Sequence, residues 1–165
     1  MNILKFALEM ELDGINYYEE LKRKSINSDL NNIFDILIKN EQEHYDICMK
    51  MLEDDKNVVF SDSTILSECS NVFNQLKNSK VELDIDDITD LLNHAMSIER
   101  SSALLYENLA DNAKDENERK IYEKIVGEER KHYFILESIA NYFNGNSDSE
   151  ITNNEFAGWN VDGMY

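Results

Sequence analysis

The sequence predicts an all-α protein, an antiparallel four-helix bundle made of two repeated helix hairpins joined by a long crossover. Three observations predict this fold class. The 165 residues include no proline, which is the strongest helix breaker. Apolar residues recur at the 3.6-residue period of a helix along the long segments of the chain. The pattern of the first helix pair also returns later in the chain at a constant offset of 88 positions.

The first hairpin is expected near the N-terminus. Its first helix runs from about residue 2 to residue 24, with Leu8 and Ile15 on one apolar stripe. A short turn follows, and Ser28 is a candidate N-cap for a second helix that ends near residue 53. Because this turn is short, the two helices must be antiparallel neighbours.

The crossover and the second hairpin complete the bundle. Residues from about 55 to 86 form the expected crossover, which contains a short helix through Leu66 and Phe73. The helices of the second hairpin are expected at about residues 87–110 and 116–143. The bundle therefore covers residues 1–143, and residues 144–165 form a C-terminal tail. The aromatic residues of this tail are expected to pin it onto the bundle or onto a partner subunit: Phe156, Trp159 and Tyr165.

Composition and charge exclude several classes of protein. The net charge of −18 argues against binding to nucleic acid, which requires a basic patch. No run of about 18 apolar residues could span a membrane, and the acidic N-terminal segment lacks the apolar stretch of a signal peptide. Two cysteines are too few for a disulfide scaffold or a cysteine-rich metal site. A cytoplasmic protein is expected.

Four glutamates and two histidines carry the strongest functional signal. In each copy of the repeat, a glutamate is followed 30 residues later by a Glu-x-x-His motif. On a helix, the two ends of this motif project from the same face, so that one ion can bind both. A four-helix bundle holds two transition-metal ions with this set of residues. The candidate metal ligands are Glu11, Glu41, His44, Glu99, Glu129 and His132.

The surroundings of these residues favour a metal site over a set of surface charges. Glu11 lies between Leu8 and Ile15 on its apolar stripe, and Glu129 follows Ile125 in the same way. A buried ionised carboxylate is very costly unless a cation or hydrogen bonds compensate it. Two divalent ions would balance four carboxylates while the imidazoles stay neutral. Mixed carboxylate and imidazole ligands suit iron or manganese.

Two tyrosines, Tyr18 and Tyr106, lie seven residues after Glu11 and Glu99, two turns further along the same helix face. The simpler interpretation makes each a buried aromatic residue whose hydroxyl is satisfied. Alternatively, each hydroxyl binds a ligand carboxylate and tunes the metal. Cys48 is expected to be a small core residue, because its counterpart in the repeat is a leucine.

Over residues 2–143 the chain resembles the ferritin-like superfamily, and most closely the diiron domain of rubrerythrins and related short bacterial ferritin-like proteins. Residues 7–18 look like the first helix of that family, and residues 40–44 and 127–132 look like its ligand helices. Residues 155–159 look like the endings of the same group. The resemblance implies a ferritin-like bundle.

The same resemblance implies roles for the six residues. Two iron ions would bind in each chain, with manganese as an alternative metal. Glu11 and Glu99 would each bind one side of the cluster, and His44 and His132 would each bind one ion. Glu41 and Glu129 would bridge the two ions. The implied chemistry is oxidation of Fe(II) by hydrogen peroxide or dioxygen, as part of oxidative-stress defence, in a protein that is usually at least a homodimer.

Two departures from rubrerythrins modify this expectation. The chain has neither the length nor the four cysteines of the rubredoxin-like domain, so its electrons would come from an external donor such as a rubredoxin-like protein. Ser102 stands where rubrerythrins carry a further glutamate, and its counterpart in the repeat is Gly14. The ligand set is therefore more like that of bacterioferritin. Two alternatives remain, a ferroxidase subunit of an iron-storage assembly and a metal-binding scaffold without turnover.

Overall fold

A computed structural model of the chain describes residues 3–25, 27–53, 58, 60, 63–78, 85–146 and 148–157. These residues contain six α-helices and no strand. The predicted all-α fold class is therefore confirmed. The helices are α1 (Ile3–Lys24), α2 (Ser28–Leu52), α3 (Ile65–Asn78), α4 (Ile85–Asp111), α5 (Glu116–Phe143) and α6 (Asn153–Ala157).

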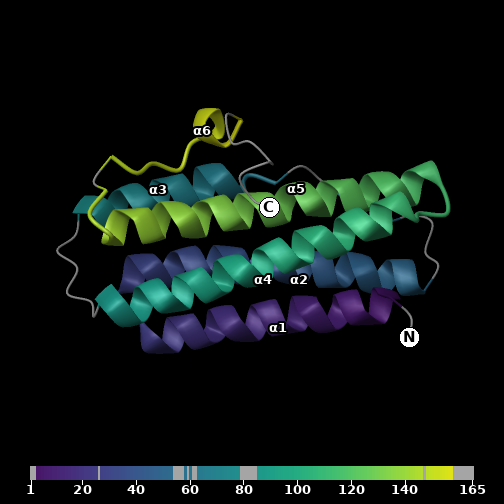
Figure 1. The fold of residues 1–165 in the computed structure, drawn as a ribbon, viewed down its shortest axis with the longest axis horizontal. Coiled ribbons are helices and arrows are strands. Elements are labelled where there is room, and N and C mark those ends of the chain that lie inside the picture. The colour runs from purple at the N-terminus through teal and green to yellow at the C-terminus, as the bar shows by residue number, and fades with distance from the viewer. Residues whose placement is uncertain are drawn as a thin grey trace.

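Four long helices form the bundle, and they run along its long axis (Figure 1). Helices α1 and α2 pack together as one hairpin, and α4 and α5 pack together as the other. Helix α1 also lies against α4, which joins the two hairpins. The crossover helix α3 packs against α2 and α5. The bundle built from two hairpins is the arrangement that the repeat predicts.

Asparagine and aspartate caps fix where two of the long helices begin. The Asn27 side chain accepts a hydrogen bond from the backbone N–H of Leu30 at 2.8 Å. Asp115 accepts in the same way from the backbone N–H groups of Asn117 and Glu118. The prediction of Ser28 as the cap of α2 is wrong by one position, because Asn27 has the extended backbone that a cap requires and Ser28 is already helical.

The buried apolar residues form two clusters. One contains Leu37 and Phe134, together with residues of α3, and the other contains Leu8 and Ile47. Along each of the four long helices, the candidate ligand positions separate residues of one cluster from residues of the other. The polar centre therefore lies between two apolar cores, each of which keeps water away from one of its ends.

The first part of the C-terminal tail packs onto α5. The ring of Phe156 lies 5.9 Å from that of Phe134, measured between ring centroids. The hydroxyl of Ser149 donates to the backbone carbonyl of Ser138 at 2.8 Å. The expected attachment of the tail to the bundle is confirmed at Phe156, whereas Trp159 and Tyr165 lie outside the described residues.

Among the described helices, none combines the length and the apolar character that a membrane crossing requires.

The capping of α2 leads to a prediction with a matched control. Asn27→Ala removes the side-chain acceptor, so we expect the free energy of unfolding to fall by about 1 kcal/mol. Ser28→Ala changes the exposed neighbour and should alter it by less than about 0.5 kcal/mol. Urea denaturation of the metal-free protein measures both. Equal effects of the two substitutions would contradict the assignment of Asn27 as the cap.

Candidate metal centre

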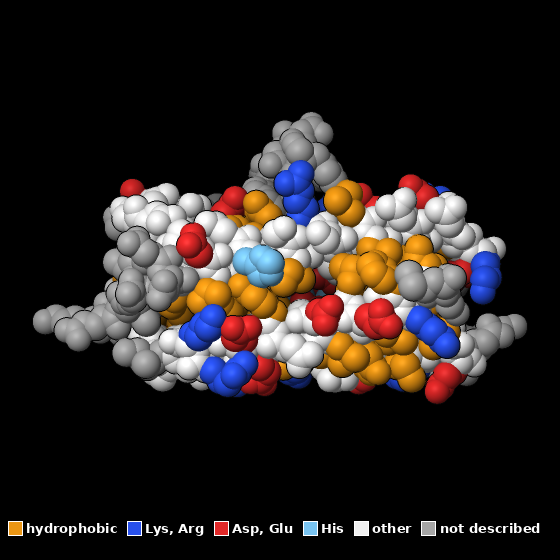
Figure 2. All heavy atoms as spheres, turned by 60° about the horizontal axis from the view of Figure 1, so that its bottom comes forward, with side chains coloured by type: hydrophobic (Ala, Val, Ile, Leu, Met, Phe, Trp, Pro, Cys, Tyr) orange, Lys and Arg blue, Asp and Glu red, His pale blue; other side chains and the backbone are white. Residues whose placement is uncertain are grey.

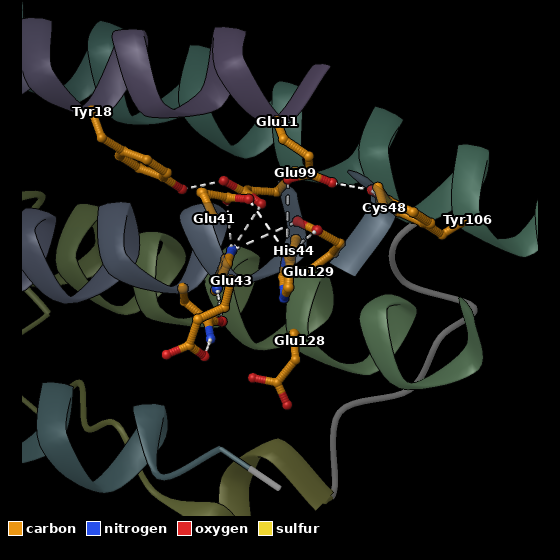
Figure 3. A network of polar contacts seen from close by, with 12 residues as sticks. Glu11, Tyr18, Glu41, Glu43, His44, Cys48, Glu99, Tyr106, Glu128 and Glu129 are labelled. Atoms are coloured by element: carbon orange, nitrogen blue, oxygen red, sulfur yellow. Dashed lines mark hydrogen bonds and ion pairs between the residues drawn. The ribbon is translucent and has the colours of Figure 1, made fainter. Parts of the chain in front are cut away.

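The structure brings all six candidate ligands into one buried cluster at the centre of the bundle (Figure 3). Glu11 comes from α1 and Glu99 from α4, while α2 and α5 each contribute a Glu-x-x-His motif. None of the six residues is more than 3 % exposed. Side chains of this polarity occur at such depth only when they compensate one another or hold an ion.

The six residues divide into two overlapping groups, and in each group one ligand atom per residue lies within 4.8 Å of the others. Glu41 and Glu129 belong to both groups. Two carboxylates are common to both groups, with one further carboxylate and one imidazole in each, so either group has the donor atoms that a metal ion would need. The groups are Glu11, Glu41, His44 and Glu129, and Glu41, Glu99, Glu129 and His132.

Each histidine turns Nδ1 towards the carboxylates. His44 Nδ1 lies 2.9 Å from Glu129 Oε1 and 3.5 Å from Glu41 Oε2. His132 Nδ1 lies 2.9 Å from Glu41 Oε1 and 3.3 Å from Glu99 Oε2. The two imidazole rings are stacked with centroids 5.6 Å apart. Both Nδ1 atoms are therefore directed at the space that the carboxylates surround.

The two tyrosines bind carboxylates of the cluster across the hairpins. Tyr18 on α1 donates to Glu99 on α4, and Tyr106 on α4 donates to Glu11 on α1. Both rings are fully buried. The Sγ atom of Cys48 lies 3.2 Å from the Tyr106 hydroxyl oxygen, and Cys48 packs in the core as expected. The sequence indicates the correct helix face for each tyrosine, but the glutamate that it reaches belongs to the other hairpin.

Burial and mutual repulsion set the protonation of the outer carboxyl groups. Burial raises the pKa of Glu11 well above its ordinary value, and the charges of Glu129 and Glu41 raise it further. Burial has the same effect on Glu99, reinforced by Glu41. These two groups therefore tend to keep a proton when no metal is bound.

The two shared carboxylates and the imidazoles behave in the opposite way. Burial raises the pKa of Glu41 and of Glu129, but the charge and hydrogen bonds of the nearby imidazoles outweigh it and hold both pKa values below the ordinary one. Burial alone would lower the pKa of His44 and of His132, yet the surrounding carboxylates raise both well above the ordinary value. The shared carboxylates and the imidazoles thus stabilise each other's charged forms.

The atoms that lack a regular hydrogen bond support metal binding. Within the described part of the chain, no hydrogen bond of normal geometry reaches either carboxylate oxygen of Glu129 or either ring nitrogen of His44, although Nδ1 of His44 faces Glu129 Oε1 at 2.9 Å as an ion pair. Glu129 and His44 are both completely buried. A buried polar atom without a partner requires an explanation, and a cation coordinated by these atoms supplies one. The donor set of oxygen and imidazole nitrogen fits iron or manganese.

The comparison with known families agrees with this geometry. The family model described as Rubrerythrin matches residues 2–77 and 90–158. The chain belongs to the rubrerythrin family. No curated protein and no solved structure matches the chain. Membership of this family indicates oxidoreductase chemistry at a metal site. The buried glutamates and histidines of this rubrerythrin-family protein are suited to hold a metal ion.

The sequence analysis does not predict two polar residues that lie beside the metal centre of this rubrerythrin-family chain. Asn40 and Glu128 each precede a shared glutamate, and both are buried. The two residues occupy equivalent positions in the repeat, 88 residues apart, and this equivalence was the signal that could have indicated a shared role. Their contacts could not be derived from it. Gly14 and Ser102 are also buried, and a Cβ atom added at Gly14 would lie 3.7 Å from the carboxyl carbon of Glu41. A large side chain at Gly14 would therefore press on a candidate ligand.

The raised pKa values lead to a prediction for metal binding by this rubrerythrin-family protein. A metal ion must displace the protons of His44, His132, Glu11 and Glu99, whose pKa values are all raised. We therefore expect the affinity for Co(II) to fall as the pH is lowered from about 8 to about 6, with protons released on binding. Calorimetric titration in two buffers of different ionisation enthalpy measures both quantities. An affinity independent of pH would contradict this account of the metal-free site.

Proposed function

We propose that the protein is a diiron-carboxylate redox enzyme that oxidises Fe(II) with hydrogen peroxide or dioxygen. One observation carries the proposal, namely four buried glutamates and two buried histidines whose ligand atoms converge in two overlapping groups. Two Fe(II) ions would bring four positive charges to four carboxylates and leave neutral imidazoles. The site would then be electrically balanced, which a buried site requires.

The proposed ligands follow from the two groups. Glu41 and Glu129 would bridge the ions because both groups share them. Glu11 and His44 would complete one position, and Glu99 and His132 would complete the other. Two iron ions held in this way would supply the two electrons that convert hydrogen peroxide and two protons into two water molecules. A separate donor, such as a rubredoxin-like protein, would return these electrons, because the two cysteines, Cys48 and Cys69, are too few for a four-cysteine iron site.

The chain contributes orientation and exclusion of water. The hydroxyls of Tyr18 and Tyr106 hold the carboxylates of Glu99 and Glu11 in place. The two apolar cores on either side keep the ligands dry, which strengthens their attraction to a cation. This arrangement favours metal chemistry over the alternative of a scaffold without turnover, which has no need of six converging ligands.

An anaerobic titration of the metal-free protein with Fe(II) tests the proposal. We expect two tightly bound irons per chain, followed by their oxidation when peroxide or dioxygen is added. Glu41→Ala and Glu129→Ala should each abolish the dinuclear site, because each removes a ligand common to both positions. Asp35→Ala, at an exposed carboxylate of α2, is the matched control and should still bind two irons. Retention of two irons in either ligand variant would refute the assignment.

A homodimer is part of the proposal, and apolar side chains on the surface support it. The large hydrophobic residues that are exposed in the described part of the chain belong to α1 and α4: Ile3, Phe6, Leu12 and Leu104. Figure 2 shows apolar side chains gathered over the face of the bundle that these helices form. Apolar surface of this kind is typical of a face that is covered in an oligomer.

Oligomer size also separates the proposed redox enzyme from an iron-storage assembly. We expect sedimentation equilibrium to give a mass of twice the 19.3 kDa of one chain. Ile3→Glu combined with Phe6→Glu should shift the protein towards the monomer, because these exposed apolar residues, three positions apart on α1, share a helix face that would then carry charge. A closed shell of many subunits would favour the storage function instead.

A further inference from the structure

The two histidines of the centre occupy equivalent positions in the repeat, but their outer ring nitrogens have different surroundings. The Nε2 atom of His132 lies 2.7 Å from Oδ1 of Asn40. Asn40 is itself held, because its side-chain amide donates to Glu43 at 3.4 Å. Within the described residues, Nε2 of His44 has no hydrogen-bond partner.

The contact with Asn40 fixes how His132 can bind a metal. A carboxylate such as Glu43 only accepts hydrogen bonds, so it orients the Asn40 amide with its oxygen towards His132. That oxygen also only accepts, so Nε2 of His132 must carry the hydrogen. The Nδ1 atom is left to face the carboxylates, where a metal ion would bind. His132 is therefore held in the orientation that coordination through Nδ1 requires, with its Nε2–H already engaged.

The repeat places Glu128 where Asn40 stands in the other copy. Positions 40 and 128 differ by 88, as do the two histidines and the pair Glu43 and Lys131. Asn40 on α2 reaches the histidine of α5, so Glu128 on α5 is the residue placed to reach His44 on α2. Its carboxylate instead accepts from the hydroxyl of Ser63 and pairs with Lys131 at 2.6 Å. In Figure 3 this carboxylate points away from the cluster.

The two histidines consequently differ in whether the outer ring nitrogen has a hydrogen-bond partner. Glu128 is only 4 % exposed and has an ionised partner, while the nitrogen that it could hold is buried and unpaired. Leaving such a nitrogen without an acceptor costs free energy that a hydrogen bond to a carboxylate would recover. Ser63 and Asn40 line the same cavity of about 170 Å³, so a water molecule could replace Glu128 as the partner of Ser63.

We propose that Glu128 is the positioning residue of His44. When metal binds, the Glu128 carboxylate parts from the Ser63 hydroxyl and accepts a hydrogen bond from Nε2–H of His44. The metal position at His132, which needs no such change, therefore fills first. This inference rests on the dinuclear site of the proposed function. His132 needs no rearrangement to bind an ion, whereas binding at His44 must include the separation of Glu128 from Ser63. The two ions are therefore bound with unequal affinity although their ligands are of the same types.

Titration of the metal-free protein with Co(II), followed by calorimetry and by the visible absorption of bound cobalt, tests the inference without turnover. We expect two resolved binding events. Asn40→Ala should weaken the tighter event by about 10- to 100-fold, and Glu128→Ala should weaken the other event by a similar factor. Glu128→Gln keeps an oxygen acceptor, so it should restore the second event to within a few-fold of the unmodified protein.

Ser63→Ala distinguishes a positioning role of Glu128 from a structural one. Removing the hydroxyl frees Glu128 in advance, so we expect the weaker event to become stronger while the tighter event stays unchanged. If the contact with Ser63 only supports the fold, the substitution should weaken cobalt binding or leave it unaltered, and either result would overturn the inference. Thr64→Ala, at an exposed neighbour, is the control.

The remaining outcomes separate this inference from the proposed function. Two equal binding events, or a weakening of both events by Asn40→Ala and by Glu128→Ala alike, would overturn the inference and leave the dinuclear site standing. Failure of the unmodified protein to bind cobalt or iron would overturn both.

Discussion

Charge compensation among buried carboxylates is the constraint on which the rest of this structure depends. Glu41 and Glu129 lie between two apolar cores, where the imidazoles of His44 and His132 hold the pKa values of both carboxyl groups below the ordinary one, and the carboxylates in turn raise the pKa values of both imidazoles. Separating these charges or removing one member would leave an uncompensated charge at the centre of the bundle, which costs several kcal/mol or more. The helices can therefore pack closely only in the register that brings the four groups together.

The same constraint would let the site exchange protons for metal without a large change in the fold. Burial favours a proton on Glu11 and on Glu99, and the other two glutamates face the imidazoles, so the charges of the metal-free site tend to balance between the two apolar cores. Metal ions that bind the folded chain and not the unfolded one add their binding free energy to its stability. A metal bound at the centre would thus stabilise the bundle.

Much of this arrangement could be predicted from the sequence, because helix period and an internal repeat are local, countable signals. The bundle, its crossover helix and the convergence of the six charged residues follow from them. The cap of α2 did not, since Asn27 and Ser28 are adjacent residues of capping type and only the backbone conformation decides between them. The partners of Tyr18 could not be predicted either, because periodicity gives the face of a helix and not which side chain of a neighbouring helix it reaches.

Asn40 and Glu128 show the same limit in a sharper form. Whether a polar residue next to a buried glutamate is exposed or buried depends on the rotation of its helix relative to the neighbouring helix. A single sequence does not determine this rotation. The assignment of Glu11, Glu41, His44, Glu99, Glu129 and His132 as metal ligands stays a prediction until metal is bound. The roles of Trp159 and Tyr165 also stay predictions, because these residues lie outside the described part of the chain.

The crossed hydrogen bonds of the two tyrosines bear on how such a chain could arise. Each hairpin supplies the hydroxyl that holds the carboxylate of the other, so the contacts would be complete if two copies of a single hairpin met about a two-fold axis. In a symmetric pair of that kind, every substitution would appear twice. Gene duplication and fusion remove this restriction, and positions 40 and 128, or 48 and 136, are then free to evolve separately. A covalently joined pair can therefore give its two halves different tasks, whereas two identical halves cannot.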